Sequence, residues 1–228
     1  MQQAYQALRV ISEAQTIHCM LTPWPTELLL TELQAACAAL QAGSDGIKAV
    51  ILDFGGPEAG PHPPGVSPRL LPAVCQTVRA IPQPVLAIVR TSLAESACRL
   101  SAEADLILVA HEAEICWPAR QEGKTAGEEE LRLDGRAAVR LGYATWSAPA
   151  GDLDREAERI LDMLRAKSAL ALRLAKAAVR TGQGSARPPQ ERLRQVNQFY
   201  LERVMATRDA REGLQAFLEK RQPRWQNR

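Results

Sequence analysis

Few side chains in this sequence have the type and spacing that catalysis requires. Glu95, Ser96 and Cys98 stand close together, and His62 lies in a run rich in proline and glycine. Glu95 could donate a proton and His62 could accept one. No histidine is near Ser96 or Cys98 in the sequence, so neither has an evident activating base. The alternatives that need no chemistry are a solvated loop histidine, a carboxylate at a helix start and a small buried thiol.

The remaining cysteines and histidines do not form a metal-binding pattern. The five cysteines are scattered, odd in number and without a CxxC pair, and the three histidines are equally dispersed. This usage predicts free thiols in a reducing compartment rather than disulfides. It also predicts neither a metal site nor a resident cofactor.

Composition narrows the class of protein. The chain has 228 residues, of which 46% are hydrophobic and 24% charged, as in ordinary soluble proteins. A net charge of +2 provides no field suited to nucleic acid or to an anionic membrane. No apolar run approaches the roughly 20 residues that span a bilayer, and the N-terminus lacks a signal-peptide pattern. We expect a cytoplasmic protein that binds neither nucleic acid nor membrane.

The elements that must position these side chains alternate between strand and helix over the first half of the chain. Alternating or continuous apolar runs predict strands, and apolar residues at helical spacing predict helices. The expected strands cover 8–10, 17–21, 48–53, 84–89, 106–110 and 114–116, and the expected helices cover 26–42, 67–80 and 94–104. This order predicts an α/β fold with a largely parallel sheet.

The second half of the chain reads differently. Residues 120–133 are polar and predict an exposed loop or a frayed helix. Helices are expected over 154–166, 168–180, 189–205 and 207–220, with a break at 181–185. We therefore expect an α/β core over residues 1–150 and a helical region over residues 151–228.

Five segments, taken in order, resemble the crotonase (enoyl-CoA hydratase/isomerase) family over nearly the whole chain. They are IKAVIL at 47–52, AIPQPVLAI at 80–88, ADLILVA at 104–110, Trp117-Pro118, and TRDAREGLQAFLEKRQP at 207–223. The resemblance implies a ClpP/crotonase-type β-β-α superhelix core with a helical C-terminal trimerisation layer.

The resemblance also implies a site in which two backbone N–H groups hold a thioester carbonyl, usually a large catalytic term. The first donor belongs to the residue after Ala59-Gly60, and Ala59 would contact CoA. That residue is Pro61, which has no N–H to give. A shift of the alignment by one residue would restore a donor. His62 stands where the family often has aspartate.

The second donor of the family comes from a glycine-rich turn that opens a helix. Here the turn is Leu93-Ala-Glu-Ser-Ala-Cys98, and the N–H of Ser96 remains as the oxyanion-hole donor. Glycines would allow a close backbone approach and unusual dihedral angles that these residues do not. Glu95 would also place a negative charge beside a developing oxyanion.

Hydratases of the family use two glutamates as general acid and base around one water. The matching positions are Arg99 and Ala119, and neither can transfer a proton in that way. The proline- and glycine-containing segment that walls the acyl pocket is largely absent between Arg120 and Arg136. The resemblance therefore implies a degenerate member without ordinary hydratase activity.

Phe217 and Lys220 match family residues that contact CoA, commonly from the neighbouring subunit. Lys220 would meet a phosphate as a point charge. The alternative is that this helix persists because it packs the trimer.

Three functions stay open. The first is an acyl-CoA-binding or accessory subunit of acyl-CoA or polyketide-type metabolism, assembled as a homotrimer or hexamer or with an active crotonase paralogue. The second is an active isomerase, hydrolase or decarboxylase with a rebuilt site, in which Ser96 polarises the carbonyl and His62 or Glu95 handles protons. The third is a scaffold that binds no CoA.

Overall fold

A six-stranded sheet forms the centre of the molecule. The computed structural model describes residues 5–42, 46–55, 66–118, 130–183 and 188–227. The sheet order is β1-β2-β3-β4-β5-β8, in which β1 is antiparallel to β2 and the other neighbours are parallel. The strands are β1 (Arg9–Glu13), β2 (Thr16–Met20), β3 (Ala49–Phe54), β4 (Val85–Val89), β5 (Leu106–Ala110) and β8 (Trp146–Ala148). The expected α/β fold with a largely parallel sheet is confirmed.

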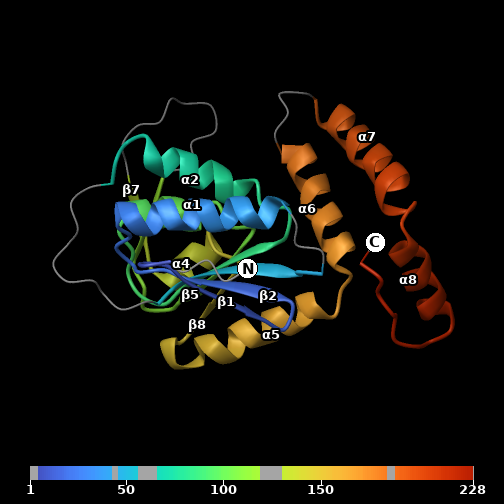
Figure 1. The fold of residues 1–228 in the computed structure, drawn as a ribbon, viewed down its shortest axis with the longest axis horizontal. Coiled ribbons are helices and arrows are strands. Elements are labelled where there is room, and N and C mark those ends of the chain that lie inside the picture. The colour runs from blue at the N-terminus through green and yellow to red at the C-terminus, as the bar shows by residue number, and fades with distance from the viewer. Residues whose placement is uncertain (1–4, 43–45, 56–65, 119–129, 184–187, 228) are drawn as a thin grey trace.

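Helices cover both faces of this sheet. Figure 1 shows α1 (Glu27–Ala42) and α2 (Leu70–Arg79) on one face and α5 (Leu153–Arg165) on the other. Every residue of β3 and β4 is buried, as expected for strands covered on both sides. Helix α1 begins where the sequence predicts, because the Thr26 hydroxyl accepts the Leu29 N–H at 3.2 Å.

The region after β5 contains structure that the sequence did not reveal. The strand β6 (Ile115–Pro118) pairs antiparallel with β7 (Glu130–Leu133), so the end of the expected loop is a strand. The helix α4 (Gly135–Arg140) and the strand β8 were also not anticipated. A Cβ on Gly135 would lie 2.1 Å from the Ala110 carbonyl oxygen, so only glycine permits α4 to meet the end of β5.

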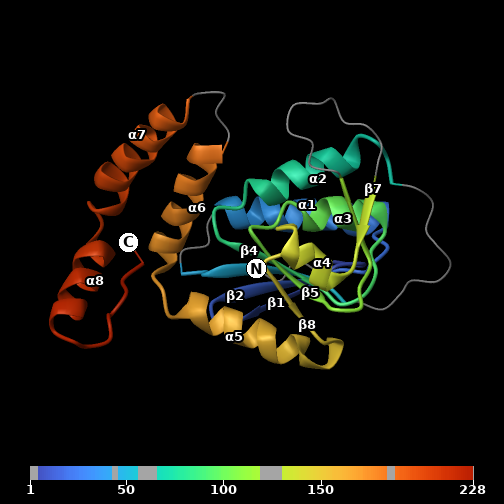
Figure 2. The same ribbon diagram turned by 180° about the vertical axis from the view of Figure 1, so that it is seen from behind.

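The C-terminal helices form a separate layer beside the sheet. After η1 (Ala150–Asp152) and α5, the layer contains α6 (Ala169–Gln183), α7 (Pro189–Phe199), the π-helical turn η2 (Tyr200–Val204) and α8 (Arg208–Leu218). Figures 1 and 2 show α6, α7 and α8 on one side of the core. Four residues of α5 (Leu153, Ala157, Ile160 and Leu161) belong to the hydrophobic core, so the projecting layer begins at α6.

Polar contacts attach α6 to the core. The Lys176 ammonium lies 2.5 Å from a carboxylate oxygen of Asp105 and donates to the Gln83 carbonyl at 2.7 Å. The same carboxylate accepts the Val85 N–H at 2.8 Å, which joins the beginnings of β4 and β5. No helix within the described residues is long and apolar enough to cross a bilayer.

Candidate functional site

The neighbouring strands β3 and β4 end at the same edge of the sheet because they are parallel. Segments that leave this edge are the ones that carry ligand sites in open α/β folds. Ala59, Pro61 and His62 follow β3 but lie outside the described residues, as does Ala119. The described part of the site is therefore the turn after β4 and the helix α3 (Glu95–Ser101) that follows it.

The turn before α3 is held in place without glycine. The Ala94 N–H donates to the Pro23 carbonyl at 3.1 Å, and the Ser92 hydroxyl accepts the Glu114 N–H at 3.2 Å. Ala94 has φ −64° and ψ 158°, which any residue adopts. The replacement of glycines in this turn therefore causes no unusual dihedral angle at Ala94, and what it changes is the space that side chains occupy.

Ser96 is well placed to supply a backbone donor. It is the second residue of α3, in the first turn, where N–H groups have no intrahelical acceptor and the helix dipole is positive. Ser96 is half-buried, and the next two residues, Ala97 and Cys98, are buried. The Cys98 thiol faces the Leu93 carbonyl at 3.7 Å, as a buried small residue rather than an exposed nucleophile. Whether Ser96 polarises a carbonyl stays a prediction.

Glu95 and Arg99 form an ion pair on the outer side of α3. Their charged atoms are 2.5 Å apart at the spacing i,i+4, and both side chains are 58% exposed. An arginine stays protonated at any pH the protein meets, so Arg99 cannot act as a general acid or base. The position that the sequence resemblance matches to a hydratase glutamate therefore holds an arginine that is paired with Glu95.

Arg90 and Asp53 make a second ion pair, which sequence reasoning missed. Arg90 follows β4 and donates two bonds of 2.8 Å to Asp53 in β3, and it lies 2.7 Å from Asp154 in α5. Hydrogen bonding to Asp53 raises the pKa of Arg90 above its ordinary value. The available signal was a charge of opposite sign near the end of each of two buried apolar runs.

Phe217 and Lys220 lie at the end of α8. Phe217 is 78% exposed. Lys220 has φ +53°, and the helix ends in a Schellman motif, in which the Lys220 N–H donates to the Phe217 carbonyl and the Arg221 N–H to the Ala216 carbonyl. Glycine usually occupies the left-handed position of this motif, so Lys220 is an unusual residue there.

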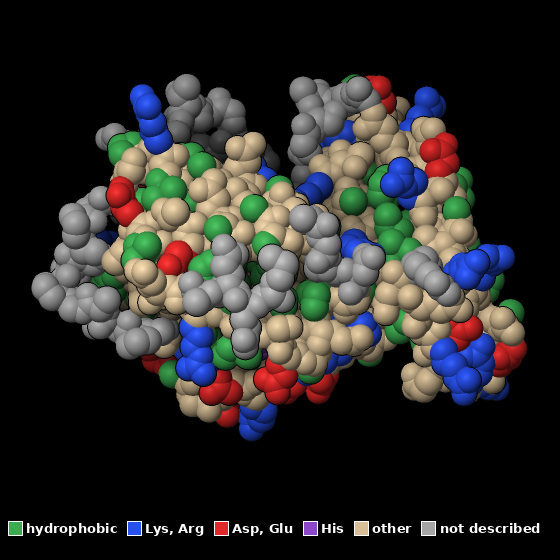
Figure 3. All heavy atoms as spheres, viewed as in Figure 1, with side chains coloured by type: hydrophobic (Ala, Val, Ile, Leu, Met, Phe, Trp, Pro, Cys, Tyr) green, Lys and Arg blue, Asp and Glu red, His purple; other side chains and the backbone are tan. Residues whose placement is uncertain are grey.

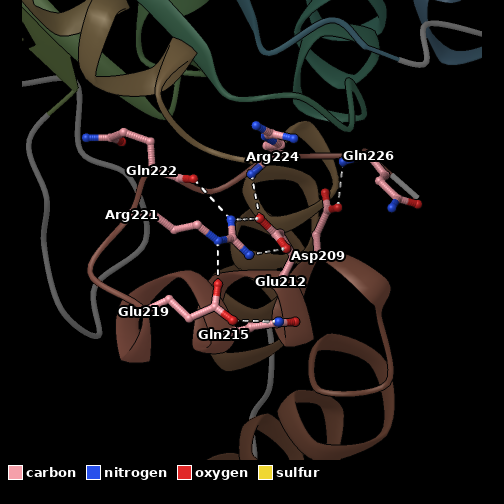
Figure 4. A network of polar contacts seen from close by, with 8 residues as sticks. All are labelled: Asp209, Glu212, Gln215, Glu219, Arg221, Gln222, Arg224 and Gln226. Atoms are coloured by element: carbon pink, nitrogen blue, oxygen red, sulfur yellow. Dashed lines mark hydrogen bonds and ion pairs between the residues drawn. The ribbon is translucent and has the colours of Figure 1, made fainter.

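Polar contacts join the C-terminal tail to α8, as Figure 4 shows. Glu212 accepts bonds from the Arg221 guanidinium at 2.6 and 3.1 Å and from the Arg224 N–H at 2.7 Å. The bond from Arg221, with that from Arg224, lowers the pKa of Glu212 to about 2. Asp209 accepts the Gln226 N–H at 2.8 Å and the buried Ser168 hydroxyl at 2.5 Å. The tail thereby joins α8 to the start of α6.

The two halves of the expected site are separated within one chain. Glu95, Ser96 and Arg99 lie together on α3, whereas Phe217 lies on α8 and Lys220 just after it. Figure 2 shows α6 between α3 and α8. A cavity of about 880 Å³ lies elsewhere, at the beginnings of β4 and β5, where Asp105, Lys176 and Arg180 line it. This cavity is at the opposite edge of the sheet from Ser96.

Sequence comparison decides the family. The model of the enoyl-CoA hydratase/isomerase family matches residues 131–228. A cyclohexa-1,5-dienecarbonyl-CoA hydratase from Thauera aromatica is 30% identical over 224 residues, which cover 86% of this chain and 84% of that protein. The chain belongs to the enoyl-CoA hydratase/isomerase family. The family resemblance drawn from the sequence is thus confirmed.

Solved structures agree with this assignment to the crotonase fold. An enoyl-CoA hydratase/isomerase from Mycobacterium paratuberculosis has a TM-score of 0.77 at 22% identity, covering 99% of this chain and 100% of that one. An enoyl-CoA hydratase from Mycobacterium smegmatis has a TM-score of 0.79 at 20% identity, covering 96% and 99%. At such identities the likeness shows the crotonase fold alone.

Among the described residues, no group of three metal-ligating side chains occurs.

Proposed function

We propose that this crotonase-family chain binds an acyl-CoA without hydrating it, as an accessory subunit of acyl-CoA or polyketide-type metabolism. The observation that carries the proposal is the ion pair between Arg99 and Glu95. Hydration needs an acid and a base aligned on one water. A guanidinium that is always charged cannot serve as either, and Glu95 is engaged with it.

The backbone conformation of Lys220 supports a role in binding. A left-handed residue other than glycine costs roughly 1 kcal/mol. The chain bears this cost at the surface, where a side chain adds little to packing, so a function of the ammonium group is the simplest account. Phosphate groups of CoA are ligands of suitable charge.

Assembly would complete the site. Phe217 and Lys220 lie beyond α6 from Ser96, so they would meet an acyl-CoA held by another copy rather than by their own chain. A homotrimer or hexamer, or an assembly with an active crotonase paralogue, would supply this arrangement. Several large apolar side chains of α7, η2 and α8 are exposed, including Leu193, Leu201 and Phe217. Such a patch is typical of a protein interface.

A second candidate is an active acyl-CoA enzyme with a rebuilt site. The 30% identical relative from Thauera aromatica is named as a hydratase of a cyclic dienoyl-CoA, which favours this candidate. In this version the Ser96 N–H polarises the thioester carbonyl, and His62 or Glu95 moves protons in an isomerase, hydrolase or decarboxylase reaction. A scaffold that binds no CoA is the remaining alternative.

The first experiment is calorimetric binding of CoA, acetyl-CoA and crotonyl-CoA to the wild type, Lys220→Ala, Lys220→Gly and Lys167→Ala. Lys167 is an exposed lysine at the α5–α6 junction and serves as the matched control. We expect both Lys220 variants to bind about tenfold more weakly, the loss of one charged contact. Lys220→Gly should at the same time unfold at a higher temperature, because glycine relieves the left-handed backbone.

The outcomes separate the three functions. Binding that both Lys220 variants weaken, without turnover of crotonyl-CoA, supports the accessory role. Turnover at enzyme-like rates, about 1 s⁻¹ or faster, contradicts that role and favours the active enzyme. If none of the three compounds binds, the remaining function is a scaffold that binds no CoA. A Lys220→Gly variant that binds more weakly and is also less stable than the wild type would refute the argument that the left-handed backbone of Lys220 is strained.

A further inference from the structure

Arg90 lies where the turn that leads into α3 begins. It is the first residue after β4, and Asp53 is the penultimate residue of the neighbouring strand β3. The planar guanidinium makes two parallel bonds of 2.8 Å to the Asp53 carboxylate, a geometry that restricts direction as well as distance. Its contact with Asp154 at 2.7 Å adds the first turn of α5. One side chain thus connects the ends of two strands and the start of a helix.

The backbone after β3 follows the side chain of Arg90 closely. A Cβ on Gly55 would lie 2.3 Å from Cδ and 2.7 Å from Nε of Arg90, which no real side chain could tolerate without displacement. Gly55 is therefore required for space. The direction in which the chain leaves β3 depends on where Arg90 lies.

We propose that Arg90 is a positioning residue that holds the stem Asp53–Gly55 at a fixed separation from the turn Thr91–Ser96. Arg90 does not touch the acyl group. It sets the place of the Ser96 N–H relative to the end of β3, in a site without the glycine-rich turn of the family. We call this connection by Arg90 the brace. Its role in acyl-CoA binding rests on the proposed function, whereas its geometry does not.

The two carboxylates that Arg90 contacts differ in burial, and this difference makes the proposal testable. Asp53 is 5% exposed, whereas the side chain of Asp154 is 84% exposed. Removal of one partner from a buried pair leaves an uncompensated charge, whereas an exposed pair contributes little. The brace is therefore Arg90 with Asp53, and Asp154 is an accessory contact.

The test compares amide hydrogen exchange in the wild type, Arg90→Gln, Arg90→Lys, Asp53→Asn and Asp154→Asn. In Arg90→Gln and Asp53→Asn we expect the Ala94 amide, which donates to the Pro23 carbonyl, to exchange at least about tenfold faster, with amides of α6 unchanged. Arg90→Lys should recover part of the protection, because it keeps the charge and loses the bidentate geometry. Asp154→Asn should match the wild type.

A second measurement asks whether the brace serves a bound thioester. Cinnamoyl-CoA absorbs at longer wavelength when donors polarise its conjugated carbonyl, so its absorption shift reports the donor geometry. We expect this shift in the wild type and its loss in Arg90→Gln, with affinity for CoA itself within about twofold. A general loss of structure around the site would weaken the binding of CoA and of cinnamoyl-CoA together. It would not remove the absorption shift while the affinity for CoA stays unchanged.

Unchanged exchange of the Ala94 amide in folded Arg90→Gln and Asp53→Asn would overturn the proposal, as would equal effects of Asp53→Asn and Asp154→Asn. A wild type that binds neither CoA nor cinnamoyl-CoA would refute the acyl-CoA function instead. In that case the exchange result would still decide whether Arg90 is the brace.

Discussion

Lys176 shows at the residue scale how a buried charge couples this fold to pH. The residue is 8% exposed and is paired with Asp105. Burial lowers the pKa of Lys176 from 10.5 to about 8, although attraction to Asp105 opposes the shift. Asp105 directly precedes β5 and accepts the Val85 N–H, so this pair helps to hold the edge of the sheet opposite the candidate site.

The sign of the resulting pH dependence follows from proton linkage. Between pH 8 and 10.5 the unfolded chain keeps Lys176 protonated while the folded protein releases the proton. The contribution of this lysine to the free energy of unfolding therefore rises with pH across that window. Urea unfolding measures this contribution as the difference between the free energies of unfolding of the wild type and Lys176→Met. We expect this difference to increase from pH 8 to 10.5. A difference that stays the same from pH 8 to 10.5 would contradict the depressed pKa.

The hairpin of β1 and β2 shows at the element scale how local sequence and tertiary demand can disagree. Glu13 pairs with Thr16, and the two loop residues Ala14 and Gln15 both have positive φ, of 45° and 64°. This is the conformation of a type I′ turn, for which Asn-Gly is the preferred sequence. The register of β1 on β2 therefore requires a turn that its own residues do not favour.

Replacement of this turn by Asn-Gly should stabilise the protein. We expect Ala14→Asn with Gln15→Gly to raise the free energy of unfolding by about 1 kcal/mol, because the positive φ values become unstrained. Chemical denaturation measures the change as a shift of the midpoint, with the same m-value in both proteins. Ala14→Val should move stability the other way, since a β-branched residue is least tolerant of positive φ. Equal stabilities for the three proteins would show that the turn carries no strain.

The C-terminal layer is the feature that matters at the scale of the whole molecule. Three exposed large apolar residues lie on the core: Leu28 in α1, Leu141 after α4 and Met163 in α5. Eight others lie in α6, α7, η2 and α8 or, for Met205, directly after η2. They are Val179, Leu193, Tyr200, Leu201, Met205, Leu214, Phe217 and Leu218. Figure 3 shows apolar side chains on this layer. A face of this kind suits burial against further copies of the chain.

Self-association through this layer can be measured directly. Light scattering should give the mass of a trimer or hexamer rather than the 25.0 kDa of one chain. Leu201→Glu should lower that mass, because a buried unpaired charge is costly at an interface. Leu141→Glu is the matched control, since Leu141 is 58% exposed but lies on the core, after α4. A monomeric wild type, or equal dissociation by both variants, would refute this interface.

Buried apolar runs made most of the fold predictable. The strands β3, β4 and β5 and the helices α1, α5, α6 and α8 occur close to the expected positions, because continuous or periodic apolar residues have few ways to leave water. The strands β7 and β8 were missed for the opposite reason. Each is only three or four residues long and is held by its partner strand rather than by its own pattern.

The sequence by itself determined the class of fold and the family, since these depend on residue types and their order. Only the tertiary structure brought Arg90 to Asp53, from positions 37 residues apart, and placed α8 beyond α6 from α3. The physical reason is range. Propensity and periodicity act over a few residues, whereas a brace between strands or a site shared by distant helices depends on how whole elements pack.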